Sequence, residues 1–105
     1  MAEKAKTAAM ALVLGEKDNV ATAIVDIDPG EVPVMFNNGV KKVKVNQPIQ
    51  YGHKFAVRDV GEDEDIIKYG EVIGISTKAI KTGEHVHVHN VASKRGRGDL
   101  EGKGA

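Results

Sequence analysis

The sequence predicts an all-β fold made of short strands. Hydrophobic residues recur with a period of two in several runs, glycine-marked turns follow at short intervals, and no long stretch carries the apolar stripe of a helix. With 105 residues, of which 41% are hydrophobic, the chain can form one core and has little room for a second. We expect one folded domain at residues 9–92, between a flexible arm at 1–8 and a glycine- and charge-rich flexible tail at 93–105.

The strand candidates are runs of β-branched and aliphatic residues separated by turn residues. They lie at 11–14, 20–27, 32–36, 40–45, 55–57, 72–75 and 84–91. In the run at 40–45, valine and lysine are interleaved, which is typical of an edge strand with one face in solvent. Asn38 and Gly39, between two such runs, predict a hairpin because both residues tolerate a positive φ. The consecutive acids at 62–65 predict a solvated loop.

Composition excludes several classes of function. Lys plus Arg and Asp plus Glu number 15 each, so the chain lacks the basic surface that nucleic-acid binding needs. The absence of cysteine rules out disulfides, thiolate metal ligands and a cysteine nucleophile. No apolar run is long enough to cross a bilayer, and we expect a soluble, cytoplasmic protein with neither a membrane nor a nucleic-acid partner. Phosphate loops, dinucleotide fingerprints and nucleophile elbows are also missing.

The segment from Gly83 to Asn90 contains three of the four histidines. In an extended strand, His85, His87 and His89 share one face, and the two valines between them point into the core. Neighbouring imidazoles would then be about 6.5–7 Å apart along the strand, which allows His87 and His89 to bind one metal ion. His85 and His89 would be about 13 Å apart, too far to share an ion unless the strand bends.

Each of these features also has a structural interpretation. The histidine face can be a solvated edge, or a surface covered by a ligand or a partner chain, instead of a metal site. His53, which follows a turn and precedes an apolar run, is either a hydrogen-bonded structural residue or a base. Lys68 and Tyr69 either present a cation to an anionic substrate or form an ordinary turn. From the residues alone we predict a small β-domain with one histidine-rich face.

Four blocks of sequence, in order, are similar to the small domain of altronate dehydratases. They are Gly52-His53-Lys54-Phe55-Ala56, Ile67-Lys68-Tyr69-Gly70-Glu71, Ile73-Gly74 and Gly83-Glu84-His85-Val86-His87-Val88-His89-Asn90. The segment from Asp18 to Ala23 is similar to the first strand of that domain, so the likeness extends over residues 11–91. The resemblance implies an SAF-type domain with a β-clip fold, like that of type III antifreeze proteins and the C-terminal domain of sialic acid synthases.

The resemblance also implies a reaction and a partner. Altronate dehydratases eliminate water from a sugar acid such as D-altronate and form a 2-keto-3-deoxy acid. In this family the small domain is either fused to a large catalytic domain or made as a separate chain. Because the sequence ends at Ala105, we expect a separate accessory subunit that is inactive alone. Its expected partners are the large catalytic subunit, which would hold most of a divalent metal site (iron or manganese), and a small sugar-acid substrate.

The family likeness places the candidate site on the histidine blocks. His53, His87 and His89 are the candidate catalytic residues, and His87 and His89 are also the candidate metal ligands. Galactarate dehydratases of the family lack the histidine trio but keep the Gly-His-Lys block, which favours His53 for an indispensable role. The expected substrate-binding residues are Lys54, Lys68, Tyr69, His85 and Asn90.

Two other functions remain open. A sulfolactate sulfo-lyase uses a similar small chain as its alpha subunit and expels sulfite instead of water from a shorter acid. A stand-alone module that binds a sugar acid or regulates another protein, without catalysis, belongs to a different class. Substrate assays distinguish a sulfolactate sulfo-lyase from an altronate dehydratase. Sugar-acid binding by the chain alone distinguishes a stand-alone module from an accessory subunit.

Overall fold

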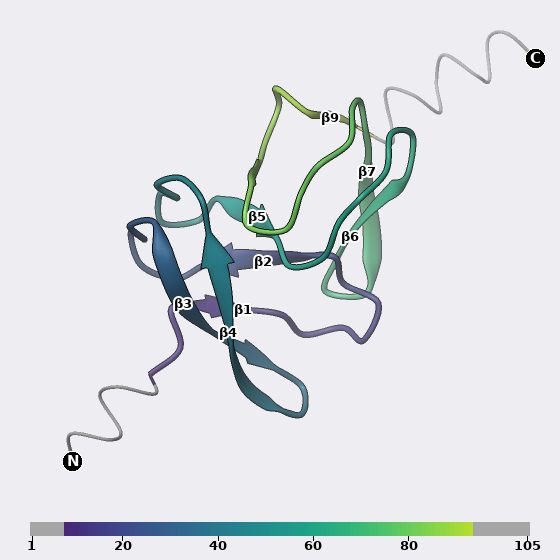
Figure 1. Cartoon of the computed structure of the whole chain (residues 1–105). Coiled ribbons are helices and arrows are strands. Elements are labelled where there is room, and N and C mark those ends of the chain that lie inside the picture. Colours follow the sequence, from purple (N-terminus) through teal and green to yellow (C-terminus); the bar gives the residue numbers. More distant parts are fainter. Residues whose placement is uncertain (1–7, 94–105) are drawn as a thin grey trace, which may run out of the picture.

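The computed structural model describes residues 8–93, which form an all-β domain without a helix (Figure 1). This confirms the predicted fold class, and this part of the chain has no helix able to cross a membrane. A six-stranded sheet has the order β4-β3-β1-β2-β5-β8, and a three-stranded sheet has the order β6-β7-β9. The predicted arm and tail lie outside the described residues, except at Ala8 and Ser93. The strands within 8–93 are β1 (Ala11–Leu12), β2 (Val20–Ala23), β3 (Gly30–Phe36), β4 (Gly39–Val45), β5 (Lys54–Ala56), β6 (Asp65–Lys68), β7 (Glu71–Ser76), β8 (His85–Val86) and β9 (Val91–Ser93).

A β3–β4 hairpin forms one edge of the larger sheet. The two strands pair antiparallel along their full lengths. On β4, Val43 and Val45 are buried and the lysines are exposed, as the interleaving of valine and lysine predicted. The predicted hairpin is therefore confirmed, although its two turn residues are Asn37 and Asn38, and Gly39 begins β4 with a φ of 129°.

The buried side chains form two clusters, where the sequence predicted room for one. They lie on opposite faces of β2 and β5, because neighbouring residues of a strand point to opposite faces. Ala21 and Phe55 belong to the larger cluster, and Val20 and Ala56 belong to the smaller one. The smaller cluster also contains Ile66 of β6, so it joins the two sheets. Buried on both faces, β2 and β5 form the rigid centre of the domain.

The structure shortens the strand predicted at 20–27 and contains one strand that was not predicted. The strand predicted at 20–27 ends at Ala23, and Ile27 forms an isolated bridge with Ile49 instead. β6 was not predicted, because it begins at Asp65 inside the acidic run and is only four residues long. It pairs antiparallel with β7 through a register shift. The three acids before it are exposed and lie outside the strands, in agreement with the predicted solvated loop.

The extended strand predicted at 84–91 is wrong over most of its length. β8 has two residues, and the next four residues turn before β9 begins. Asn90 closes this turn: its Oδ1 accepts from the backbone N–H of His87 (2.9 Å), and its Nδ2 donates to the carbonyl of His85 (2.9 Å). Such side-chain bonds compete with the ladder bonds of a continuous strand. Val88, predicted to point into the core, is consequently 81% exposed.

A buried carboxylate connects the loop before β2 with the turn between β6 and β7. Asp18 is fully buried and accepts backbone N–H bonds from Tyr69 and Gly70, both at 2.8 Å, and from Gly15 at 3.1 Å and Leu14 at 3.3 Å. The loops pack so closely that a Cβ on Gly15 would lie 2.7 Å from the nitrogen of Gly70. Asp18 thus holds the β6–β7 turn against the loop that precedes β2.

Replacing Asp18 with alanine leaves several N–H groups without their acceptor. Since an unpaired buried donor costs about 1–3 kcal/mol, we expect Asp18→Ala to lower the free energy of unfolding by roughly 3 kcal/mol or more. Urea unfolding followed by circular dichroism measures this loss. Asp28→Ala, at an exposed aspartate, is the matched control and should change stability by less than about 0.5 kcal/mol. Equal losses in the two variants would show that Asp18 is not an anchor.

Candidate functional site

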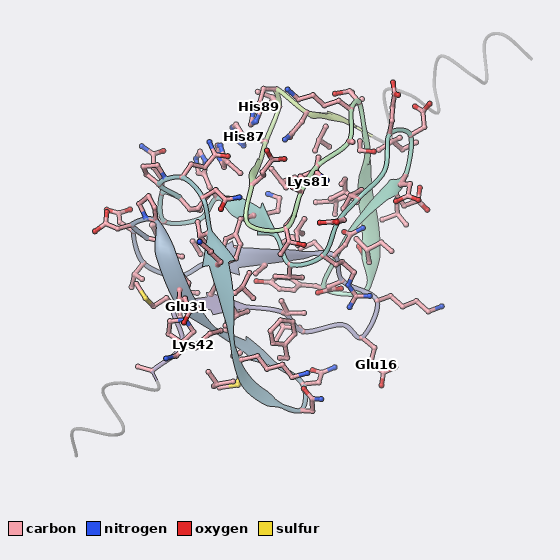
Figure 2. All side chains as sticks on the ribbon, viewed as in Figure 1. Glu16, Glu31, Lys42, Lys81, His87 and His89 are labelled. Carbon is pink, nitrogen blue, oxygen red and sulfur yellow. The ribbon has the colours of Figure 1, made fainter. Side chains whose placement is uncertain are left out.

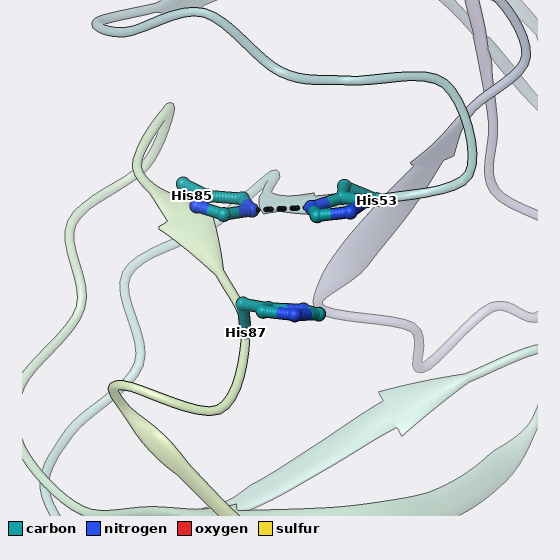
Figure 3. A group of neighbouring side chains, drawn as sticks. All are labelled: His53, His85 and His87. Atoms are coloured by element: carbon teal, nitrogen blue, oxygen red, sulfur yellow. Dashed lines mark hydrogen bonds between the residues drawn. The ribbon is translucent and has the colours of Figure 1, made fainter.

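The pairing of β5 with β8 builds a cluster of histidines from two distant segments. In this antiparallel pair, Lys54 lies opposite Val86 and Phe55 lies opposite His85. His53 comes just before β5 and His87 just after β8, so both histidines reach the side of the sheet where His85 lies (Figure 3). We call His53, His85 and His87 the histidine cluster.

The rings of the histidine cluster form two layers. Nδ1 of His53 lies 2.9 Å from Nε2 of His85, their ring centroids are 5.1 Å apart, and their planes differ by 13°. These two rings therefore lie edge to edge and nearly in one plane, joined by an N–H···N hydrogen bond (Figure 3). The ring of His87 lies parallel to that of His53 in the next layer, with centroids 4.5 Å apart and planes 17° apart.

His89 lies beside the cluster and outside its centre. Its ring centroid is 5.3 Å from that of His85, and the ring planes are tilted by 35°. An extended strand would have separated these two histidines by about 13 Å. The turn closed by Asn90 brings His85 and His89 close together. The chain therefore has the bend that the sequence analysis required if these two histidines are to share a site. Figure 2 shows His87 and His89 on the same side of the domain.

Three imidazoles of this chain are close enough to fit one metal ion. His53, His85 and His87 each offer a ring nitrogen, and these nitrogens all lie within 4.8 Å of one another. An all-imidazole donor set suits zinc, iron, cobalt or nickel better than magnesium, calcium or manganese, which prefer oxygen ligands. The sequence analysis had named the pair His87 and His89. The geometry instead brings His53 and His85 together with His87.

Desolvation and repulsion from neighbouring groups favour the neutral forms of His85 and His87. The pKa of His85 is lowered from its usual 6.5, first by desolvation and then by repulsion from His53, His89, His87 and Lys54. The pKa of His87 is lowered by local desolvation, His53, Lys54 and His89 in that order. Both rings are therefore mainly uncharged at pH 7, with lone pairs free to accept a proton or bind an ion.

Lys54 lies close to the histidines, and Lys68 lies within electrostatic range of Lys54. The pKa of Lys54 is lowered by partial burial and by the charge of Lys68, which places the two ammonium groups within electrostatic range of each other. Lys68 also lies over the ring of Tyr69, with its Nζ 5.0 Å from the ring centroid. Lys54 and His87 border an open groove of about 250 Å³ whose other lining residues are Ile66, Ile73, Val86, Val88 and Val91.

Of the other predicted substrate-binding residues, Tyr69 and Asn90 hold defined structural positions. The Asn90 side chain is 3% exposed, and both its ends bond to backbone groups of the histidine turn. Tyr69 adopts a φ of 53° and its N–H is held by Asp18. Their contact with a substrate stays a prediction. The sequence analysis did not single out Asp18, and an aspartate just after a glycine-led tight turn is the signal that could have found it.

Comparison with known proteins identifies the family. The sequence profile of the altronate/galactarate dehydratase SAF domain matches residues 9–94. The chain belongs to this SAF-domain family. It is 48% identical over 62 residues to the (2R)-sulfolactate sulfo-lyase subunit alpha of Chromohalobacter salexigens, an overlap of 59% of this chain and 66% of the relative. It is 41% identical over 75 residues to the altronate dehydratase of Bacillus subtilis, an overlap of 71% of this chain and 14% of the relative.

A second sulfo-lyase subunit alpha, from Paracoccus pantotrophus, is 34% identical over 62 residues, an overlap of 59% of this SAF chain and 92% of the relative. The SAF chain therefore spans most of the length of one small subunit, 66% of another, and only 14% of a dehydratase. The family resemblance found in the sequence is confirmed. The reactions and assemblies in these names belong to the relatives.

The lowered pKa of His85 makes stability depend on pH. Histidine in the unfolded chain titrates near 6.5, and His85 in the folded, metal-free protein titrates lower. The unfolded chain therefore binds more protons between these two values, so the free energy of unfolding should fall as the pH is lowered from 7 through 6.5 and level off below the folded pKa.

We expect His85→Gln to reduce this slope, as measured by urea unfolding at a series of pH values in the presence of a chelator. NMR titration of the His85 ring protons gives the folded pKa directly. A value at or above 6.5 would contradict the lowered pKa of His85.

Proposed function

We propose that this chain is the SAF module of a hydroxy-acid lyase and that it forms the substrate-facing side of an active site completed by a large catalytic subunit. The main support is the histidine cluster, which adjoins Lys54 and the groove. No carboxylate is among the described residues that line this groove. A site with imidazoles and ammonium groups and without acids fits an anionic, hydroxyl-rich ligand.

The charged groups suit the carboxylate of a sugar acid. Lys54 and Lys68 repel each other, as the lowered pKa of Lys54 indicates. An anion between or beside them relieves that repulsion and forms charge-assisted hydrogen bonds. The substrate's hydroxyl groups would then be directed toward His53 and His87, whose rings donate or accept hydrogen bonds according to tautomer.

The reaction that fits this site is elimination of water next to a carboxylate. A base takes the proton from the carbon that bears the carboxylate, the C–O bond at the neighbouring carbon breaks, and the leaving hydroxide takes a proton and departs as water. The resulting enol becomes the 2-keto-3-deoxy acid by tautomerisation. In our proposal the imidazolium form of His53, His87 or His89 donates its proton to the leaving hydroxyl, and the large subunit supplies the base together with iron or manganese, which would polarise the substrate.

The open groove, its exposed apolar residues and the names of two relatives favour a second chain as partner. The groove is shallow and open, so this chain alone does not exclude water from a bound acid. Its exposed Val88 and Ile73 also leave apolar surface at the groove uncovered. The relatives called subunit alpha are, by that name, parts of larger assemblies. We propose that the groove face is covered by the large subunit and that this closure completes the site.

A sulfo-lyase is the second candidate function. It is favoured by the 48% identity to a (2R)-sulfolactate sulfo-lyase subunit alpha. The two lyases place the same demands on this chain, because both bind a small anionic hydroxy acid and protonate or stabilise a leaving group. They differ in the group expelled, sulfite or water. A stand-alone binding module is the third candidate, and it requires tight binding of the acid without a partner.

A pull-down with this chain as bait should recover the large subunit, and the reconstituted pair should convert D-altronate while the chain alone does not. A panel with D-altronate, galactarate and sulfolactate then identifies the leaving group through keto-acid or sulfite detection. Activity of the chain alone would refute the accessory role. Micromolar binding of a sugar acid by the chain alone, without a recovered partner, would favour the binding module.

In the reconstituted pair, His87→Ala and His89→Ala should lower kcat on the order of 100-fold if these rings act as general acids. Circular dichroism and partner binding check that each variant is folded. Unchanged kinetics in both variants would restrict the histidines to a structural role.

Lys54→Met should act on substrate binding. Loss of one charge-assisted contact of about 1.5–3 kcal/mol raises KM roughly 10- to 100-fold. Lys42→Met, at an exposed lysine of edge strand β4, is the matched control and should leave KM unchanged. An equal effect of the two variants would show that only overall charge matters.

A further inference from the structure

The histidine cluster contains most of the imidazole side chains of this protein. The sequence has four histidines and no cysteine. Three of the histidines form the cluster, and the ring of the fourth, His89, packs beside His85. Every imidazole of the protein is therefore collected in one place, although the segments that hold them are far apart in the sequence.

The positions of the three rings are set by the backbone before any ion binds. The β5–β8 pairing fixes Phe55 opposite His85. Asn90 holds the backbone N–H of His87 and the carbonyl of His85 with bonds of 2.9 Å each. Such anchoring lowers the cost of ordering ligands when an ion arrives.

The nitrogen spacing is close to that of a metal shell. Two nitrogens bound to one tetrahedral zinc ion at about 2.05 Å are roughly 3.3 Å apart. The facing nitrogens of His53 and His85 are 2.9 Å apart, and all three donor nitrogens lie within 4.8 Å. Small changes in ring rotation would therefore bring them around one ion. The hydrogen now shared between His53 and His85 would move to the other nitrogen of the same ring, which frees both lone pairs without loss of a proton.

We propose that His53, His85 and His87 bind one divalent transition-metal ion, of the zinc, cobalt, nickel or iron(II) type, within this chain. Three imidazole ligands leave at least one position for water or for an oxygen of a bound acid. The groove beside His87 and Lys54 provides the entry path. This inference goes beyond the proposed function, which places the metal in the large subunit, and it does not depend on that function.

Lys54 opposes an ion in this place, because its positive charge acts on His85 and His87. Among residues 8–93, the side chains whose ligand atoms converge here are three histidines without a carboxylate, so nitrogen coordination holds the ion. This makes the site selective. Magnesium and calcium, which bind through oxygen and charge, gain little from neutral imidazoles, whereas zinc and cobalt gain directed bonds.

The test uses the full, untagged chain, because a histidine tag would itself bind metal. After removal of metal with a chelator, isothermal titration with Zn²⁺ should give one ion per chain, and Co²⁺ should develop the visible absorption of a nitrogen-bound ion. Mg²⁺ and Ca²⁺ should give no signal under the same conditions.

Single variants then locate the ligands. His53→Gln, His85→Gln and His87→Gln should each weaken zinc binding on the order of 100-fold, since even loss of a supporting contact costs 10- to 100-fold. His89→Gln, the remaining histidine, is the matched control and should change affinity only a few-fold. Circular dichroism and urea unfolding verify the fold of each variant.

The proposal fails if the untagged chain binds no zinc, or if His89→Gln weakens binding as much as His87→Gln while His53→Gln has no effect. The second result would assign the ion to the pair His87 and His89. Because the readout is metal binding by the chain alone, its outcome is independent of lyase activity. Loss of zinc binding with retained activity in the reconstituted pair would remove the metal site and leave the proposed function standing.

Discussion

The short pairing of β5 with β8 is the constraint on which the site depends. It involves only two register pairs, Lys54 with Val86 and Phe55 with His85. It is stable because Phe55 is fully buried in one apolar cluster, and Ala56 and Val86 are buried in the other. A strand clamped on both faces cannot shift its register without exposing apolar side chains. The histidines that flank the two strands therefore meet in one arrangement.

Close backbone contacts and buried polar side chains hold the adjoining loops. A Cβ on Gly83 would collide with the backbone oxygen of Lys44, so only glycine, here with a φ of 91°, allows the segment to enter β8. Asn90 fixes the exit by bonding to the backbone at His85 and His87. Asp18 holds the β6–β7 turn by accepting hydrogen bonds from its backbone N–H groups. It thereby positions the end of β6, which carries Lys68. Loops tied down in this way can present functional side chains with little loss of entropy on binding.

The electrostatic character of the site follows from what surrounds it. Desolvation and mutual repulsion favour the uncharged forms of His85 and His87, and Lys54 adds positive charge beside them. Neutral nitrogen donors and positive charge have different chemical uses. The nitrogen atoms can bind a soft ion or exchange protons, and the positive charge attracts an anion. A lyase acting on a hydroxy acid needs both, and in this chain they lie around one groove. With an ion bound to His53, His85 and His87, His89 is the candidate residue left to protonate the leaving group, and the two proposals are tested by separate readouts.

The sequence was sufficient for the all-β class, the β3–β4 hairpin and the lysine-lined edge strand, because alternation and turn residues are short-range properties. It was sufficient for the SAF family because the order of the matching blocks can be compared along the chain without knowledge of the fold. It also identified the individual histidines. It could not show that His53 joins His85, because that contact arises from pairing between segments 32 residues apart. Nor could it show that the chain turns after Val86 and leaves Val88 exposed. A period of two indicates which face a side chain takes while a strand lasts, but the bonds from Asn90 that end this strand exist only once the loop is folded around it.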